Sequence, residues 1–175
     1  GILELIEAFN KICDLDEDLE LLLLNAEHSH PSSAEFISEI NKLVLEFNIE
    51  NRVRVINDYL EEEESIELLS QADLIVMPYQ QTGESSSAAV RTALASGSPV
   101  IVTPLDIFDD VSDAVIYLNG ISPDEIATGI KSFMNGNLEW DIDKANNWKS
   151  YHSYDIVSTR LHNIIGSLMI NSTLN

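Results

Sequence analysis

The 175-residue chain has few or none of several residue types, and each shortage excludes a class of protein. Its one cysteine, Cys13, can form no internal disulfide and no CxxC motif for a metal or a redox couple. Nine lysines and arginines against thirty aspartates and glutamates leave a formal net charge of −21. Such a charge repels the phosphates of nucleic acids and of anionic membranes. We therefore expect no nucleic-acid partner.

The chain also lacks the apolar segments that target a protein to a membrane. Its longest apolar runs, such as residues 21–24, are far shorter than the roughly 20 residues of a membrane span. No charged segment and cleavage site precede the first apolar pattern, as a signal peptide would require. Together with the free thiol of Cys13, this favours a cytoplasmic protein without a transmembrane segment. Because the sequence opens with Gly1 inside a helical pattern, we interpret it as an internal piece of a longer protein or as a deliberately trimmed chain.

What is present is a regular alternation of two hydrophobic patterns, in a chain long enough for one domain. Apolar runs of strand length predict strands at 19–24, 53–56, 73–77, 99–103 and 115–118, with helical periods between them. Such alternation indicates an α/β fold with a Rossmann-like, doubly wound and mostly parallel sheet. A unit of this kind normally begins with a strand whose turn cradles phosphate, whereas this chain begins with a helix. The first strand and its turn are therefore predicted to be missing.

Two helix starts carry capping signals. Ser122, Pro123 and Glu125 combine an N-cap, a proline at the first helical position and a capping carboxylate. Ser32 and Glu35 have the same capping-box spacing and predict the start of the second helix.

The most unusual segment follows the third predicted strand. Ligands of open parallel sheets bind beyond the carboxyl ends of the strands, which makes the loop at 78–87 a candidate site. Gly83 permits a tight turn, and Ser85, Ser86 and Ser87 offer hydroxyls beside the free N–H groups of a helix start. That arrangement suits an anion such as a diphosphate. Taken alone, it favours an ordinary helix start, in which one serine is the N-cap and the others are solvated.

Glu84 lies in the same loop and also has two interpretations. A carboxylate at a helix start is stabilised by the helix dipole and needs no ligand. A carboxylate in a ligand-facing loop also hydrogen-bonds strongly to sugar hydroxyls. The residues alone leave both interpretations open.

Several short motifs occur in a fixed order along the chain. They are LELIEAF at 3–9 behind Gly1, NRVRV at 51–55, SQADLIVMP at 70–78, Glu84, and ALASGSPVIVT at 93–103. This series resembles the C-terminal, donor-binding domain of retaining glycosyltransferases with the GT-B fold, family 4 (group 1). The resemblance covers roughly residues 1–135.

The resemblance implies a single Rossmann-like nucleotide-sugar-binding domain over residues 1–175, with 136–175 as C-terminal helices. It would be half of a two-domain GT-B protein, a hexosyltransferase that acts in bacterial surface polysaccharide biosynthesis. The family needs no metal and no cofactor, since the nucleotide-sugar donor is a substrate. Its N-terminal acceptor domain is absent from this chain and is an expected partner, so the chain alone is expected to be inactive. That domain is also the expected route by which a cytoplasmic protein would associate with a membrane.

The resemblance also carries roles to individual residues. In the family a Glu-x7-Glu motif crosses the donor site, with the first glutamate beside the transferred sugar and the second on the ribose. The first falls on Glu84, the expected catalytic residue, and the second on Thr92, which lacks the bidentate reach of a carboxylate. The Gly-Phe-Gly that commonly follows the first glutamate is replaced by three serines, and the base is expected beside the second strand. The expected donor-binding residues are Asn57, Asp58, Gly83, Ser85, Ser86, Ser87 and Thr92.

Other polar groups are interpreted as structure. Arg91 is the only basic residue near the motif, and we interpret it as a solvated helix residue. The family's basic pair for the diphosphate lies just before the glycine that Gly1 resembles. Four aspartates at 106–113 could chelate a hard cation, but they match the family's loop near the sugar and the family is metal-independent. Because His28 and His30 also lack a third ligand at zinc spacing, no metal site is expected.

The aromatic residues near the C-terminal end, Trp140, Trp148, Tyr151 and Tyr154, have roughly helical spacing and are expected mostly in the core. In the resembled fold the C-terminal helices return toward the missing domain. Part of this surface and of the last helix is therefore expected to be an exposed interdomain face.

Two other functions stay open. A nucleotide-sugar epimerase of the same fold also binds such donors, and Glu84 alone does not separate it from a transferase. The loss of the second glutamate to Thr92 is compatible with a degenerate, non-catalytic transferase domain that acts as an interaction subunit. Basic residues in the upstream loop would favour a transferase, and their absence would favour the non-catalytic domain.

Overall fold

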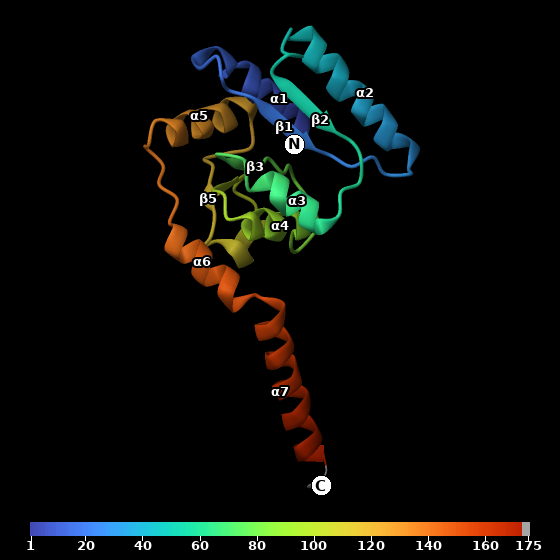
Figure 1. The fold of residues 1–175 in the computed structure, drawn as a ribbon, viewed down its shortest axis with the longest axis vertical. Helices are drawn as coiled ribbons and strands as arrows, with labels where there is room; N and C mark the ends of the chain where they lie inside the picture. Colours follow the sequence, from blue (N-terminus) through green and yellow to red (C-terminus); the bar gives the residue numbers. More distant parts are fainter. Residues whose placement is uncertain (173–175) are drawn as a thin grey trace.

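The computed structural model describes residues 1–172, and Figure 1 shows its ribbon. The last three residues of the domain predicted over 1–175 lie outside the described part. The strands are β1 (Leu21–Leu24), β2 (Val53–Ile56), β3 (Ile75–Met77), β4 (Val100–Val102) and β5 (Ile116–Tyr117). The helices are α1 (Ile2–Asn10), α2 (Pro31–Glu46), α3 (Glu62–Leu69), α4 (Ala88–Ser96), α5 (Pro123–Met134), α6 (Ile142–Tyr151) and α7 (Tyr154–Ser172), with 3₁₀ turns η1 (Cys13–Leu15) and η2 (Asp106–Val111). The predicted α/β alternation is confirmed.

The strands pair in parallel, as predicted, but in two small sheets rather than one. β1 pairs with β2, with Leu21 opposite Val53. β4 lies between β3 and β5, and its Ile101 is opposite Val76 and Ile116. Within residues 1–172, no strand pairing joins β1 to β3, so the strands form two separate sheets.

Two apolar clusters cover the two faces of the β3-β4-β5 sheet, which gives a three-layer arrangement there. One cluster combines α1, α2 and α5 with side chains such as Leu23 and Ile101. The other combines α4, η2 and Ala145 of α6 with Val100 and Val102. Successive residues of β4 thus point to opposite clusters, as the period of two in a strand requires. All three are fully buried, which is the reason that this strand is an unbroken apolar run.

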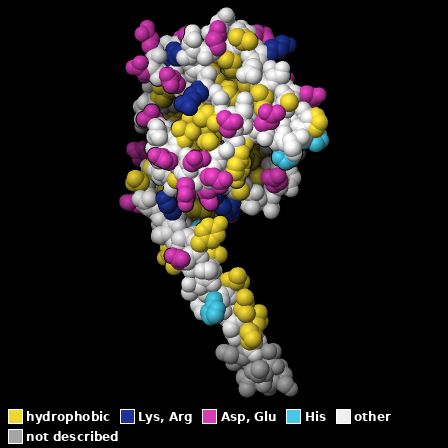
Figure 2. Space-filling model, turned by 45° about the vertical axis from the view of Figure 1, so that its right-hand side comes forward, with side chains coloured by type: hydrophobic (Ala, Val, Ile, Leu, Met, Phe, Trp, Pro, Cys, Tyr) yellow, Lys and Arg dark blue, Asp and Glu magenta, His cyan; other side chains and the backbone are white. Residues whose placement is uncertain are grey.

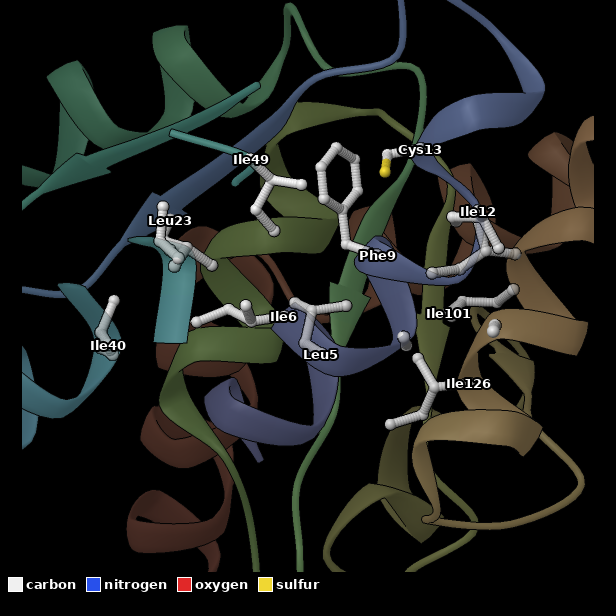
Figure 3. Close-up of a cluster of buried hydrophobic side chains, with 14 of the residues drawn as sticks. Leu5, Ile6, Phe9, Ile12, Cys13, Leu23, Ile40, Ile49, Ile101 and Ile126 are labelled. Atoms are coloured by element: carbon white, nitrogen blue, oxygen red, sulfur yellow. The ribbon is translucent and has the colours of Figure 1, made fainter. Parts of the chain in front are cut away.

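Helix α1 contributes much of the first cluster because its apolar residues repeat at helical spacing. Leu5, Ile6 and Phe9 are all buried and lie between Leu23 and Ile101 in the close-up of Figure 3. Each such side chain stabilises the fold by about 1.5–3 kcal/mol relative to an exposed position. Cys13, directly after this helix, is buried and free.

The two capping predictions have different outcomes. Ser122 caps α5 as predicted, since its hydroxyl accepts from the N–H of Glu125 and its own N–H donates to the Glu125 carboxylate at 3.0 Å. The box predicted at Ser32 and Glu35 is wrong. Helix α2 begins two residues earlier than a Ser32 cap implies, and its N-cap is His30, whose ring accepts from the N–H of Ser32 at 3.3 Å. The reason is Pro31, whose fixed φ suits the first helical position and moves the cap to the residue before it.

Helix α7 extends away from the body (Figure 1), and apolar side chains are visible along it in Figure 2.

Trp140 and Trp148 pack against the second cluster as expected, and their indole N–H groups donate to the backbone carbonyls of residues 114 and 110. The expectation of a core position is wrong for Tyr151 and Tyr154, which are 53% and 88% exposed because α7 leaves the body here. None of the described helices is both long and apolar enough to cross a membrane.

Candidate functional site

The loops that follow the strands provide the candidate site, because ligands of open parallel sheets bind at the carboxyl ends of the strands. Helix α1 begins at this edge, since Gly1 lies against Pro78, which follows β3. A Cβ atom on Gly1 would overlap the carbonyl of Pro78. Only glycine therefore fits this close approach of two backbones.

The base of the loop after β3 is held by three side chains that sequence patterns did not single out. The Tyr79 hydroxyl lies 3.0 Å from the Ser87 hydroxyl. The Thr103 hydroxyl donates to the carbonyl of Tyr79 at 2.7 Å, and the Gln80 amide donates to the carbonyl of Ile121 at 3.0 Å. These bonds tie the loop to β4 and to the loop after β5. Their signal in the sequence is weak, because most of the partners are distant along the chain.

The three predicted serines have different environments. Ser87 is the N-cap of α4, and its hydroxyl accepts from the N–H of Val90 at 3.2 Å. It is only 2% exposed, so its hydroxyl is engaged inside the protein. Ser85 and Ser86 are exposed, as is Gly83, which has open space where a side chain would be. The tip of the loop thus offers its polar groups to solvent next to a helix start.

Glu84 and Thr92, the two positions of the Glu-x7-Glu spacing, lie on different elements. Glu84 is exposed at the loop tip, and its N–H donates to the Thr82 hydroxyl at 3.2 Å. Thr92 is half-buried in the second turn of α4. No described residue forms a hydrogen bond or an ion pair with the Glu84 carboxylate, so it is available to a ligand.

Arg91 is not the solvated helix residue that we expected. Its guanidinium forms an ion pair with Asp110 and donates to the carbonyl of Ser87 at 2.6 Å. A cation at the start of a helix is opposed by the helix dipole, and the Asp110 carboxylate offsets that cost. The pair is about 40% exposed at both ends, so its net stabilisation is modest, about 0.2–1 kcal/mol.

The aspartates at 106–113 belong to the 3₁₀ turn η2 and its surroundings, in agreement with the interpretation as loop structure. Trp148 donates to the carbonyl of Asp110 at 3.0 Å and Tyr117 to that of Phe108 at 2.9 Å. Burial is the main cause that raises the pKa of Tyr117, and the negative charges of Asp109 and Asp110 raise it further. Within residues 1–172, no group of three or more His, Cys, Asp or Glu side chains is arranged to hold a metal ion.

Asn57 and Asp58 follow β2, away from the serine loop. The carbonyl of Asn57 accepts from the N–H of Glu27 at 2.7 Å, and its Oδ1 is buried without a partner among the described residues. Asp58 is exposed and borders a hollow of about 220 Å³ together with Leu24 and Tyr59. This loop follows a strand of the two-stranded sheet, whereas the serine loop follows β3 of the three-stranded sheet.

Residues 1–153 match the family described as Glycosyl transferases group 1. The chain belongs to this family. Among the curated proteins, none matches the sequence. The group 1 assignment confirms the resemblance drawn from the motifs at 3–9, 51–55, 70–78 and 93–103.

Solved glycosyltransferases share the fold of this group 1 chain. HepE from Anabaena, solved with UDP, superposes with a TM-score of 0.74 at 15% identity over 95% of this chain and 45% of its own. A glycosyltransferase from Rickettsia africae superposes with a TM-score of 0.76 at 16% identity, over 97% of this chain and 44% of its own. The third structure is the C-terminal domain of LpcC, a group 1 glycosyltransferase from Francisella tularensis. It superposes with a TM-score of 0.64 at 18% identity, over 92% of this chain and 79% of its own. The chain thus has the Rossmann-like fold of GT-B enzymes and spans less than half the length of the first two.

Proposed function

We propose that this chain is the donor-binding half of a retaining glycosyltransferase, and that its ligand is a nucleoside diphosphate sugar. The observation that carries the proposal is the exposed loop tip with Glu84, which leads into α4 at the carboxyl edge of a parallel sheet. Membership of the glycosyl transferases group 1 family supports the choice of chemistry. HepE, which shares the fold, was solved with UDP and with UDP-glucose, so UDP is the first ligand to test.

The diphosphate lies at the start of α4 in this proposal. The N–H groups of the first turn and the exposed hydroxyls of Ser85 and Ser86 donate to its oxygens. Ser87 acts through its cap, which fixes the direction of the helix start, and Gly83 lets the tip turn. The same donors stabilise the negative charge that builds on the departing phosphate during transfer.

The two ends of the donor lie on either side of this anion position. The exposed carboxylate of Glu84 accepts hydrogen bonds from hydroxyls of the transferred sugar. The base lies at Asn57 and Asp58, and Thr92 supplies one hydrogen bond to the ribose. Because the two loops follow strands of different sheets, the nucleotide binds in an extended form in this proposal.

The complete enzyme, in this proposal, is a cytoplasmic hexosyltransferase of bacterial surface polysaccharide biosynthesis. An N-terminal domain supplies the acceptor site, and the family's loop before the glycine that Gly1 resembles supplies the cations that this chain, at −21, does not supply. No metal or cofactor takes part. The chain alone binds the donor and does not transfer the sugar.

Calorimetric titration with UDP, GDP, ADP and dTDP tests the proposal. We expect one nucleotide to bind saturably, with weaker binding in Ser86→Ala and unchanged binding in the matched control Ser38→Ala, on the exposed part of α2. Glu84→Ala should weaken only the sugar-bearing form, and Glu139→Ala should change neither. Failure of all four nucleotides to bind would refute the claim that this chain is by itself a donor-binding unit.

A non-catalytic, degenerate transferase domain is the second candidate, and two observations favour it. Arg91, the one cation of the first turns of α4, is already paired with Asp110. Thr92 also stands where the family has its second glutamate. Under this candidate no nucleotide binds, and Glu84→Ala has no effect on any ligand.

A further inference from the structure

The hollow at the carboxyl end of the two-stranded sheet has mainly apolar walls. They come from the ends of β1 and β2 and from the segment that follows β2, and they consist of Leu24, Ile56, Tyr59 and Leu60. At about 220 Å³ the hollow is smaller than the pockets of about 300–1,000 Å³ that enclose drug-sized ligands. It therefore suits one flat ring system. Tyr59 is 79% exposed, so much of its aromatic ring is open to such a ligand.

The one charged group at this hollow is an acceptor of hydrogen bonds. The carboxylate of Asp58 borders the hollow and has no hydrogen bond or ion pair with any residue among 1–172. Asn25 and Ser65 are the other polar residues of the lining, and no described lysine, arginine or histidine belongs to it. In the same loop, the buried Oδ1 of Asn57 has no partner among the described residues. Since buried polar groups in folded proteins are almost always hydrogen-bonded, this loop is short of N–H donors.

Nucleobases differ in the groups that they present to a carboxylate. Guanine has two adjacent donors, the ring N1–H and the exocyclic N2 amino group, which match the two oxygens of one carboxylate. Uracil and thymine have one ring N–H between two carbonyl oxygens, so a carboxylate that accepts from it also meets a carbonyl oxygen. Adenine has one amino group beside a ring nitrogen that is itself an acceptor.

The charge around the hollow acts in the same direction. Ser65 of the lining belongs to α3, whose first turn carries the carboxylates of Glu62, Glu63 and Glu64. The whole chain has a net charge of −21. A negative potential favours a base edge made of N–H groups, which carry partial positive charge, over an edge made of carbonyl oxygens.

We infer that this hollow selects guanine, so that the donor of the proposed transferase is a GDP-sugar. Asp58 is the specificity-determining residue, and its carboxylate accepts from N1–H and from the N2 amino group of guanine. The side-chain amide of Asn25 offers a donor to the guanine O6 atom. The inference rests on the proposed function for the presence of a nucleotide and goes beyond it by naming the base. HepE was solved with UDP, but at 15% identity it shares the fold alone.

Calorimetric titration of the natural chain and of Asp58→Asn with GDP, XDP, UDP and ADP tests this inference. Xanthosine diphosphate, XDP, has a carbonyl oxygen where GDP has the N2 amino group. An asparagine amide, with one donor and one acceptor, therefore matches xanthine, whereas a carboxylate matches guanine. We expect the natural chain to bind GDP at least about tenfold more tightly than each other nucleotide. Asp58→Asn should lose about tenfold or more in affinity for GDP and gain a similar factor for XDP.

Asp143→Asn, at an exposed aspartate of α6, is the matched control and should leave all four affinities unchanged. Because Asp58 is exposed, its substitution should also leave the thermal unfolding of the chain unchanged, which separates a lost contact from a lost fold.

Three results would overturn the inference. Saturable binding of UDP or ADP at least as tight as that of GDP would do so and would leave the proposed donor-binding function standing. Equal affinities for GDP in the natural chain and in Asp58→Asn would show that this carboxylate does not read the base. Failure of every nucleotide to bind would refute the inference together with the proposed function.

Discussion

At the scale of single residues, the buried hydroxyl of Ser87 connects the candidate site to the core. It caps α4 and contacts the Tyr79 hydroxyl at 3.0 Å. We expect Ser87→Ala to lower the free energy of unfolding by about 1–2 kcal/mol, because a cap is lost and a half-buried phenol loses its partner. Urea denaturation measures this.

The exposed neighbour Ser86 is the matched control. Ser86→Ala removes the same hydroxyl from a solvated position, so its unfolding free energy should change by no more than about 0.5 kcal/mol. Equal losses in both variants would show that the cap does not decide the stability of this helix start.

Glu125 gives a prediction on pH. Hydrogen bonds from Ser122, the side chain first, lower the pKa of Glu125 below its ordinary value. A carboxyl whose pKa is lower in the folded state stabilises the fold above the unfolded pKa and ceases to do so as pH falls through the folded pKa. We therefore expect Glu125→Gln to be less stable than the natural chain at pH 7 and equal to it at low pH.

Thermal unfolding of both proteins between pH 7 and pH 2.5 measures the difference. Glu139→Gln, at an exposed carboxylate outside any capping box, is the control and should show no such convergence. A difference that is constant across this range would contradict the role of the ionised Glu125 in the cap.

At the scale of elements, α7 differs from the other helices. Its Leu161, Ile164 and Leu168 are each more than half exposed, and a helix gains most of its stability from packing. We expect that shortening the chain after Ser153 lowers the free energy of unfolding by less than about 1 kcal/mol. The main interaction lost is the contact of Arg160 with the Tyr151 ring.

Trp148→Ala provides the contrast within the neighbouring helix. It removes an indole that packs on the second cluster and donates to the backbone carbonyl of Asp110. The free energy of unfolding should therefore fall by about 2 kcal/mol or more. A loss after truncation as large as that of Trp148→Ala would mean that α7 packs on the body in solution.

At the scale of the whole molecule, the excess of acidic residues controls the response to salt. Asp and Glu are spread over the face of the body seen in Figure 2, and a net charge of −21 destabilises a compact chain through self-repulsion. We expect the melting temperature to rise by at least about 2 °C between 20 and 300 mM NaCl, as screening shortens the range of the repulsion. Differential scanning calorimetry at pH 7 measures it. A melting temperature that falls over this range would show that attractive ion pairs outweigh the repulsion.

Much of the fold was predictable, because strands buried on both faces appear as apolar runs and helices as periodic ones. β4 is the clearest case, with its three consecutive buried residues. The candidate site was predictable only in outline. The loop and its serines stood out, but nothing local indicated that Ser87 alone is buried or that Thr103 holds the loop from 24 residues away. The partner of Arg91 lies 19 residues further along the chain, and a sequence pattern contains no information on such a distant pair.

The sequence by itself determined the class of fold, the parallel direction of the strands and the family, because these depend on periodicity and on short motifs within one element. Only the tertiary structure decided which groups are engaged and which are free. It divided the strands into two sheets, paired Arg91 with Asp110, and left the Glu84 carboxylate at the loop tip without a partner among the described residues. The physical reason is that burial and pairing are properties of contacts between distant segments, which exist only once the chain has folded.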